Sequence, residues 1–66
     1  MTRIEVNGEP REISGTTLAE ALLELGCGAA KVATALNGEF VPASARANQT
    51  LRDGDRVEVL APMQGG

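Results

Sequence analysis

The last two residues, Gly65 and Gly66, are the part of this 66-residue sequence whose types could carry chemistry. Glycine lacks a Cβ and has the widest backbone freedom, so a diglycine end can thread a channel too narrow for any side chain. Extended from Pro62, the end would reach about 16–18 Å, far enough to place its carboxylate in a partner's active site. That carboxylate is ionised and unreactive at neutral pH. We therefore expect Gln64 and Gly65 to thread, and the Gly66 carboxyl carbon to be activated by a partner.

Other side chains are weaker candidates for chemistry. Cys27 is the only cysteine and the sequence has no histidine, so neither an activated thiolate nor a zinc site is indicated. Asp53 and Asp55 flank Gly54, a pattern typical of turn hydrogen bonds rather than of an acid/base pair. We expect no catalytic residue, no metal and no bound cofactor in the chain itself.

The composition indicates one small globular domain. Six basic and nine acidic residues give a net charge of −3, which disfavours nucleic acid because phosphate binding needs a basic face. No segment resembles a signal peptide or a membrane span, and a single cysteine is usual in a reducing compartment. We expect a cytoplasmic protein with no membrane partner. Arg46, Arg52 and Arg56 are expected to be solvated charges.

Two hairpins are predicted around Asn-Gly pairs, which favour the type I′ turn. The first covers residues 3–14 with its turn at Asn7-Gly8, and Pro10 places its second strand at a sheet edge because proline donates no hydrogen bond. The second covers residues 31–41, with its turn at Asn37-Gly38.

A helix is predicted between the hairpins. Thr17 and Glu20 have the spacing of a capping box, and Gly26 suits the position after a helix end. The helix of about nine residues carries one apolar stripe, made of Leu18, Ala21, Leu22 and Leu25.

The remaining segments complete a two-layer fold. Residues 43–50 are expected to form a loop with one helical turn, with Leu51 filling the core below it. A turn at residues 53–55 precedes a strand at residues 56–60, whose two valines point inward. One helix on one sheet is an α+β fold, and we expect the first and last strands to lie side by side and parallel, the β-grasp arrangement.

With these elements in this order, the sequence resembles the ThiS family, the sulfur carriers of thiamine biosynthesis. The resemblance covers the whole length and rests on residues 35–39, Val41-Pro42, residues 51–57 and the final Gln64-Gly65-Gly66. It implies a ubiquitin-like β-grasp, with a mixed four- to five-stranded sheet packed on one main helix. The domain would span residues 1–61, followed by a flexible C-terminal tail at residues 62–66.

The resemblance also implies a function and partners. The terminal glycine, here Gly66, would be adenylated by an ATP-using activating enzyme (ThiF-like) and converted to a thiocarboxylate by a sulfur donor system. A thiazole synthase (ThiG-like) would then take the sulfur. The chain itself would be a carrier and co-substrate, not an enzyme.

A partner-binding surface is expected where the sheet meets the tail. Leu60, Pro62 and Met63 would bridge the two. Phe40, the only aromatic residue, is expected to pack in the core or the hairpin, but if exposed it would join an apolar patch of the kind that marks partner sites.

Three other functions remain open on the sequence. A small subunit of molybdopterin synthase would co-purify with a large synthase subunit, although such subunits tend to be longer. A ubiquitin-like modifier would form covalent ladders on denaturing gels. A pure binding module would be indifferent to blocking of its terminal carboxylate.

Overall fold

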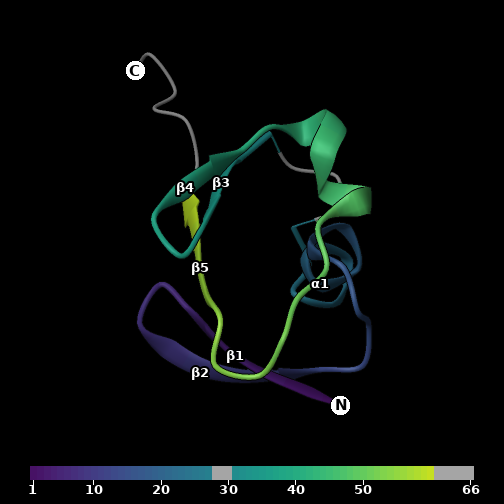
Figure 1. Cartoon of the computed structure of the whole chain (residues 1–66), viewed down its shortest axis with the longest axis vertical. Helices are drawn as coiled ribbons and strands as arrows, with labels where there is room; N and C mark the ends of the chain where they lie inside the picture. Colours follow the sequence, from purple (N-terminus) through teal and green to yellow (C-terminus); the bar gives the residue numbers. More distant parts are fainter. Residues whose placement is uncertain (28–30, 61–66) are drawn as a thin grey trace.

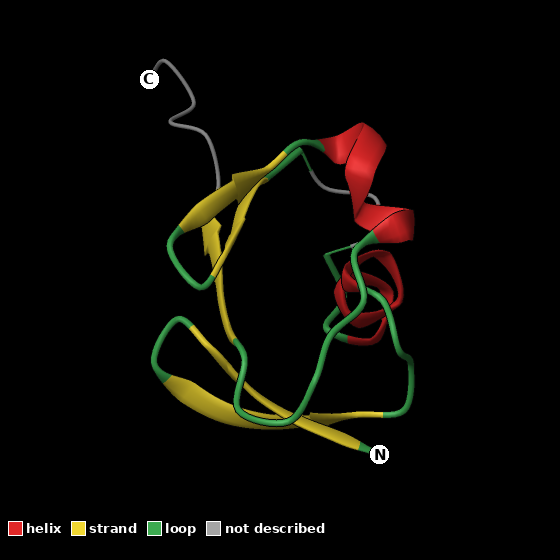
Figure 2. Ribbon diagram, viewed as in Figure 1, coloured by secondary structure: helices red, strands yellow, loops and turns green. Residues whose placement is uncertain are grey.

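A curved five-stranded sheet faces a helical layer in the computed structural model, which describes residues 1–27 and 31–60 (Figures 1 and 2). The strands wrap one side of the chain, and α1 and a 3₁₀ helix, η1, occupy the other (Figure 2). In chain order the elements are β1 (Thr2–Val6), β2 (Glu9–Ile13), α1 (Leu18–Glu24), β3 (Ala33–Leu36), β4 (Glu39–Val41), η1 (Ala43–Asn48) and β5 (Arg56–Leu60).

The sheet has the strand order β2-β1-β5-β3-β4, which confirms the predicted mixed β-grasp. β1 and β5 pair in parallel, whereas the two hairpins and the β3–β5 pair are antiparallel. Pro10 lies in β2, an edge strand, where its missing N–H costs no ladder hydrogen bond. β5, the last element of the described residues, is the central strand.

Both hairpin turns have the predicted backbone geometry. Asn7 and Asn37 have φ of 52° and 51°, and the glycines that follow them have φ of 86° and 87°. Positive φ at both central residues defines a type I′ turn, and Asn-Gly is the pair that adopts it at least cost.

Helix α1 begins with the predicted capping box. The Glu20 amide donates to Thr17 Oγ1 at 3.2 Å, and the Thr17 amide donates to Glu20 Oε1 at 3.2 Å. The helix has seven residues rather than about nine, because Leu25 is already the C-cap and Gly26 follows it with φ of 83°. Left-handed φ at the residue after the cap ends a helix.

The core lies between the inner sheet face and the helical layer. Its buried apolar side chains are Ile4, Ile13, Leu18, Ala21, Leu22, Leu36, Val41, Leu51 and Val57. They include the predicted Leu51, and Cys27 and Val59 are partly buried against them. The segment before Leu51 forms η1, longer than the single turn expected.

Arg46 is the one arginine whose predicted solvation is wrong. Its Nε donates to Thr34 Oγ1 at 3.0 Å and its Nη2 donates to the Val32 carbonyl at 2.5 Å. The buried Thr34 hydroxyl in turn donates to the Val41 carbonyl at 2.7 Å. Arg46 therefore joins η1 to the second hairpin, and the hydroxyl buried inside that hairpin has both its donor and its acceptor capacity used.

Two glutamates of α1 hold the segment that precedes the helix. Glu24 accepts from the amides of Ser14 and Gly15 at 2.8 and 2.6 Å, and Glu20 accepts from the Thr16 amide at 2.7 Å. This network requires that residue 15 have no side chain, because a Cβ there would lie 2.5 Å from Glu20 Cβ and 3.0 Å from Glu24 Oε2.

We expect Gly15→Ala to lower stability through this steric conflict. Overpacking of this kind costs about 1–3 kcal/mol, and each kcal/mol lowers the melting temperature of a domain this small by about 4–8 °C. The control is Gly8→Ala, where the added Cβ meets nothing within 4 Å and only the positive φ is penalised. Thermal unfolding of both variants measures the two separate costs, and a Gly15→Ala melting temperature equal to that of the wild type would contradict a contact effect at Gly15.

We also expect the capping box to lose strength in acid. The Thr16 amide, followed by the Thr17 amide, stabilises the Glu20 carboxylate and holds its pKa below the ordinary value of 4.5. A depressed folded-state pKa contributes stability that is present above the unfolded-state pKa and is lost as the pH falls through the folded-state pKa. Glu20→Gln should therefore be less stable than the wild type at pH 7, with the gap closing below pH 4. Urea unfolding across that range measures the gap, and a gap independent of pH would refute the effect.

Candidate functional site

The described end of β5 is the base of the predicted functional tail. Leu60 is the last residue of that strand. Gln64, Gly65 and Gly66, as well as Pro62 and Met63, lie outside the described residues, and so does the expected domain boundary between residues 61 and 62. The structure therefore defines the platform from which residues 61–66 continue.

An apolar patch covers the outer sheet face beside this base. Phe40 is 71% exposed and Leu60 is 66% exposed, so the expectation that Phe40 packs in the core is wrong. The reason is register: Phe40 lies opposite Ala35, and because its neighbour Val41 faces inward, Phe40 must face outward. Ala33, opposite Leu60, and Ala35 lie on the same face, and the exposed Glu58 borders them, opposite Ala35 on β5. We call Ala33, Ala35, Phe40 and Leu60 the outer patch.

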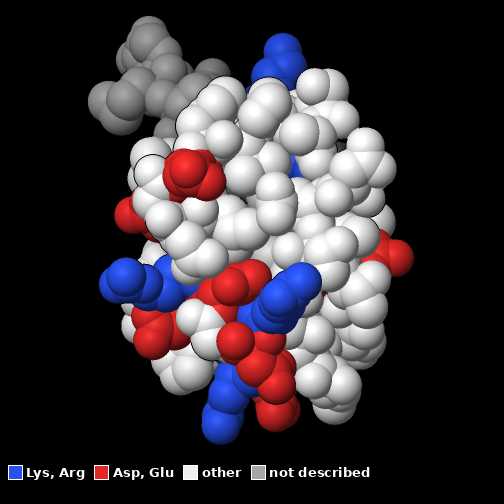
Figure 3. Space-filling model, viewed as in Figure 1, with Lys and Arg blue, Asp and Glu red and all other residues white. Residues whose placement is uncertain are grey.

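Charge is distributed unevenly around the molecule. In the face shown in Figure 3, acidic and basic side chains gather mainly toward the end formed by β1 and β2, whereas near β3 and β4 uncharged atoms surround a few acidic side chains. An apolar area with a polar border is typical of a protein docking site.

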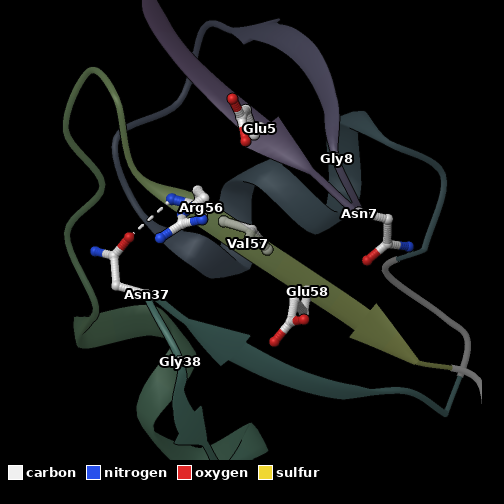
Figure 4. A pocket seen from close by; sticks show the side chains of 8 residues that line it. All are labelled: Glu5, Asn7, Gly8, Asn37, Gly38, Arg56, Val57 and Glu58. Carbon is white, nitrogen blue, oxygen red and sulfur yellow. Dashed lines mark hydrogen bonds between the residues drawn. The ribbon is translucent and has the colours of Figure 1, made fainter.

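A shallow hollow of about 410 Å³ adjoins β5 between the two hairpin turns. Figure 4 shows it, with Asn7-Gly8 and Asn37-Gly38 at its sides and Val57 of β5 in its floor. Its charged lining consists of Glu5, Arg56 and Glu58. These opposite charges give it no single sign, so it has no evident preference for an anion or a cation.

The two turn asparagines, which the sequence indicated only as turn residues, also bind β5. Asn7 Oδ1 accepts from the Val59 amide at 2.9 Å, and Asn7 Nδ2 donates to the Val59 carbonyl at 3.1 Å. Asn37 Oδ1 accepts from the Arg56 amide at 2.9 Å, as the dashed line in Figure 4 shows. Asparagine at a turn gives no signal of a partner some twenty or fifty residues away, which is why sequence reasoning missed both contacts.

The predicted turn role is confirmed for Asp55, whose Oδ2 accepts from the Arg52 amide at 2.8 Å. It is wrong for Asp53, whose Oδ1 accepts from the distant Arg3 amide of β1 at 2.9 Å and so ties this turn to the first strand. Within residues 1–27 and 31–60, no three side chains of the metal-binding types lie close enough to hold an ion. In the same ranges no helix has the length and apolar character needed to cross a bilayer.

Comparisons with known proteins agree with this arrangement. The model of the ThiS family matches residues 4–66. The sulfur carrier protein ThiS of Thermus thermophilus is 49% identical over 61 residues, which is 92% of this chain and 95% of that protein. A thiazole synthase of Paramagnetospirillum magneticum is 43% identical over 65 residues, which is 97% of this chain but only 20% of the synthase.

Solved structures show the same fold. The crystal structure of the thiamine biosynthesis protein (ThiS) of Geobacter metallireducens is 36% identical, with a TM-score of 0.82 over 98% of this chain and 100% of that one. The solution structure of a thiamine biosynthesis protein from the same organism gives a TM-score of 0.75 over 98% and 88% of the two chains. With a family match that includes all but the first three residues, the chain belongs to the ThiS family.

Proposed function

We propose that this chain is a sulfur carrier of thiamine biosynthesis whose Gly66 carboxylate is converted to a thiocarboxylate. The observation that carries the proposal is the 49% identity to a sulfur carrier over nearly the full length of both chains. The family match that continues to Gly66 supports this residue as the attachment point. Gly65 and Gln64 are the residues that thread into the partner's site.

Two balanced steps account for the conversion. A carboxylate oxygen of Gly66 attacks the α-phosphorus of ATP, pyrophosphate leaves, and an acyl-adenylate forms. A sulfide-level nucleophile then attacks the carboxyl carbon, AMP leaves, and the thiocarboxylate remains. The first step supplies a good leaving group where the free carboxylate has none, and both steps take place in the active site of a partner.

Two partners follow from this chemistry. An ATP-using activating enzyme performs the adenylation, and a thiazole synthase accepts the sulfur. Support for the second comes from the synthase of P. magneticum, one fifth of which corresponds to almost all of this chain. A carrier-like segment within a thiazole synthase chain is consistent with contact between the two activities.

The outer patch is the proposed docking surface for the activating enzyme. Phe40 and Leu60 leave large apolar side chains exposed to solvent, which does not stabilise the free domain. Such exposed apolar area is typical of a surface that binds a partner. Leu60 also ends β5, so a partner held at the outer patch is already next to the first residues of the tail, with Pro62 and Met63 extending the contact.

The test is the mass of the intact protein after incubation with ATP, an activating enzyme and sulfide, followed by fragmentation of the C-terminal peptide. A gain equal to the exchange of one oxygen for one sulfur, located at Gly66, is the expected result. Omission of ATP is the control and should prevent the gain. No gain with an enzyme that is active on another carrier would overturn the proposal, and a covalent ladder with other proteins would favour a modifier instead.

A further inference from the structure

The parallel β1–β5 ladder ends before β5 does. The amides of Glu5 and Asn7 donate to the carbonyls of Asp55 and Val57, each at 2.9 Å, and β1 then turns away at Gly8. Alternate residues of a strand point their backbone groups to the same side, so the N–H and C=O of Val59 also face β1. No backbone of β1 remains to bind them, and the Asn7 side-chain amide takes both at 2.9 and 3.1 Å.

Asn37 likewise binds a backbone group of β5 that no strand pairs with, at the other end of that strand. The β3–β5 ladder ends with Leu36 opposite Val57, and the Arg56 amide beyond it is bound by Asn37 Oδ1 at 2.9 Å. Figure 4 shows the two asparagines on opposite sides of β5, Asn37 beside its first residues and Asn7 beside its later part. The two sites share residue type, turn type and φ. They differ in which end of β5 they hold and in their donor contact, because Asn37 Nδ2 donates to Asp55 Oδ1 at 3.1 Å whereas Asn7 Nδ2 donates to β5 itself.

We propose that Asn7 is a positioning residue for the carrier reaction, because its side-chain amide fixes the end of β5 from which the chain continues toward Gly66. This inference rests on the proposed function. Among the described residues, the last two residues of β5 are held besides by β3, through the register pairs of Val59 with Thr34 and of Leu60 with Ala33. Without the amide, Val59 and Leu60 have one neighbouring strand instead of two-sided support.

Loosening this end has a specific kinetic consequence. The outer patch then includes a Leu60 at a strand end that is held from the β3 side alone, and the partner must order this end when it binds. Ordering one further residue weakens binding about tenfold. Once the complex has formed, the reacting groups are the same as before, so KM for the carrier should rise about tenfold while kcat changes less than twofold.

Asn7→Gly and Asn37→Gly are the matched variants that test this. Glycine accepts the positive φ of both turns, so each variant removes an amide side chain and keeps its hairpin. Steady-state adenylation by the activating enzyme gives KM and kcat, and hydrogen exchange of backbone amides reports which end of β5 opens. Both are measured well below the melting temperature of each variant.

We expect the higher KM in Asn7→Gly only, together with at least tenfold faster exchange at the Val59 amide. Asn37→Gly should keep the wild-type KM and show its faster exchange at Arg56. An equal rise of KM in both variants would show that Asn7 has only a general structural role and would contradict the inference. Unchanged protection of Val59 in Asn7→Gly would overturn the inference outright.

Asn7→Asp keeps the test informative if Asn7→Gly does not fold. Aspartate tolerates left-handed φ and retains an acceptor for the Val59 amide, but it loses the donor to the Val59 carbonyl. Its KM and Val59 exchange should lie between those of the wild type and Asn7→Gly, and wild-type values for both would refute the inference. If wild-type carrier is not adenylated by an active enzyme, the proposed function fails, and the exchange data alone decide whether Asn7 fixes the end of β5.

Discussion

Deletion of Gly66 is expected to abolish thiocarboxylate formation while leaving the fold and its stability unchanged. The shortened chain still ends in a glycine carboxylate, so the loss would not come from a change in chemical group. It would come from reach, since one residue shortens an extended tail by about 3.3–3.6 Å. A displacement of even 1 Å at a reacting atom can cost about 100-fold in rate.

Intact-mass measurement after incubation with ATP, activating enzyme and sulfide checks this result, and thermal unfolding checks the fold. Gly66→Ala is the companion variant, because it keeps the length and adds one Cβ where the channel is expected to be narrow. Sulfur incorporation in the Gly66 deletion at the wild-type rate would show that the partner does not measure tail length and that Gly66 is not the required attachment point.

Leu60→Asp is expected to raise KM for adenylation about 10- to 100-fold. Burial of a leucine side chain in an interface contributes about 1.5–3 kcal/mol, and the aspartate would in addition have to lose its hydration there. Leu60 is already 66% exposed, so the free domain should tolerate the change.

Leu23→Asp provides the control for this prediction. Leu23 is 69% exposed, almost as much as Leu60, but it lies on α1 in the helical layer rather than on the sheet. The same substitution there should leave KM within twofold of the wild type. Titration of carrier in the adenylation assay gives both values. If the two variants weaken binding equally, the effect is one of added negative charge, and the outer patch is not the docking surface.

Local sequence patterns predicted the local structure of this chain well. Each Asn-Gly pair became a type I′ turn, and the spacing of Thr17 and Glu20 became a capping box, because the forces that decide these features act between residues at most four apart. The order of these elements, together with the family resemblance, also predicted that the first and last strands lie side by side and parallel. The structure confirms this pairing between β1 and β5.

Features that depend on distant residues were predicted less well. Arg46 appeared to be a solvated charge because nothing near it in the sequence shows that Val32 and Thr34 have free acceptors for its guanidinium. Phe40 was expected to pack in the core or the hairpin unless it proved to be exposed, and the register with Ala35 turns it outward. Asn7 binds a residue 52 positions away.

The ends of strands were also predicted less accurately than their existence. The second hairpin was expected to begin at Lys31, but β3 begins at Ala33, which is paired with Leu60 at the end of β5. Of the candidate site residues, only Phe40 and Leu60 lie among the described residues, where both are exposed. Their role in docking stays a prediction.

The position of the last strand at the centre of the sheet also governs how the domain assembles. The β1–β2 and β3–β4 hairpins can each form early, because their contacts are local, but each pairs with β5 and they do not pair with each other. Closure of the sheet must wait for the final strand, and such pairing between distant segments is a slow step in folding. A chain truncated before Arg56 would have two separate hairpins and no continuous sheet. The domain can therefore fold only when β5, the strand that leads to the tail, is present.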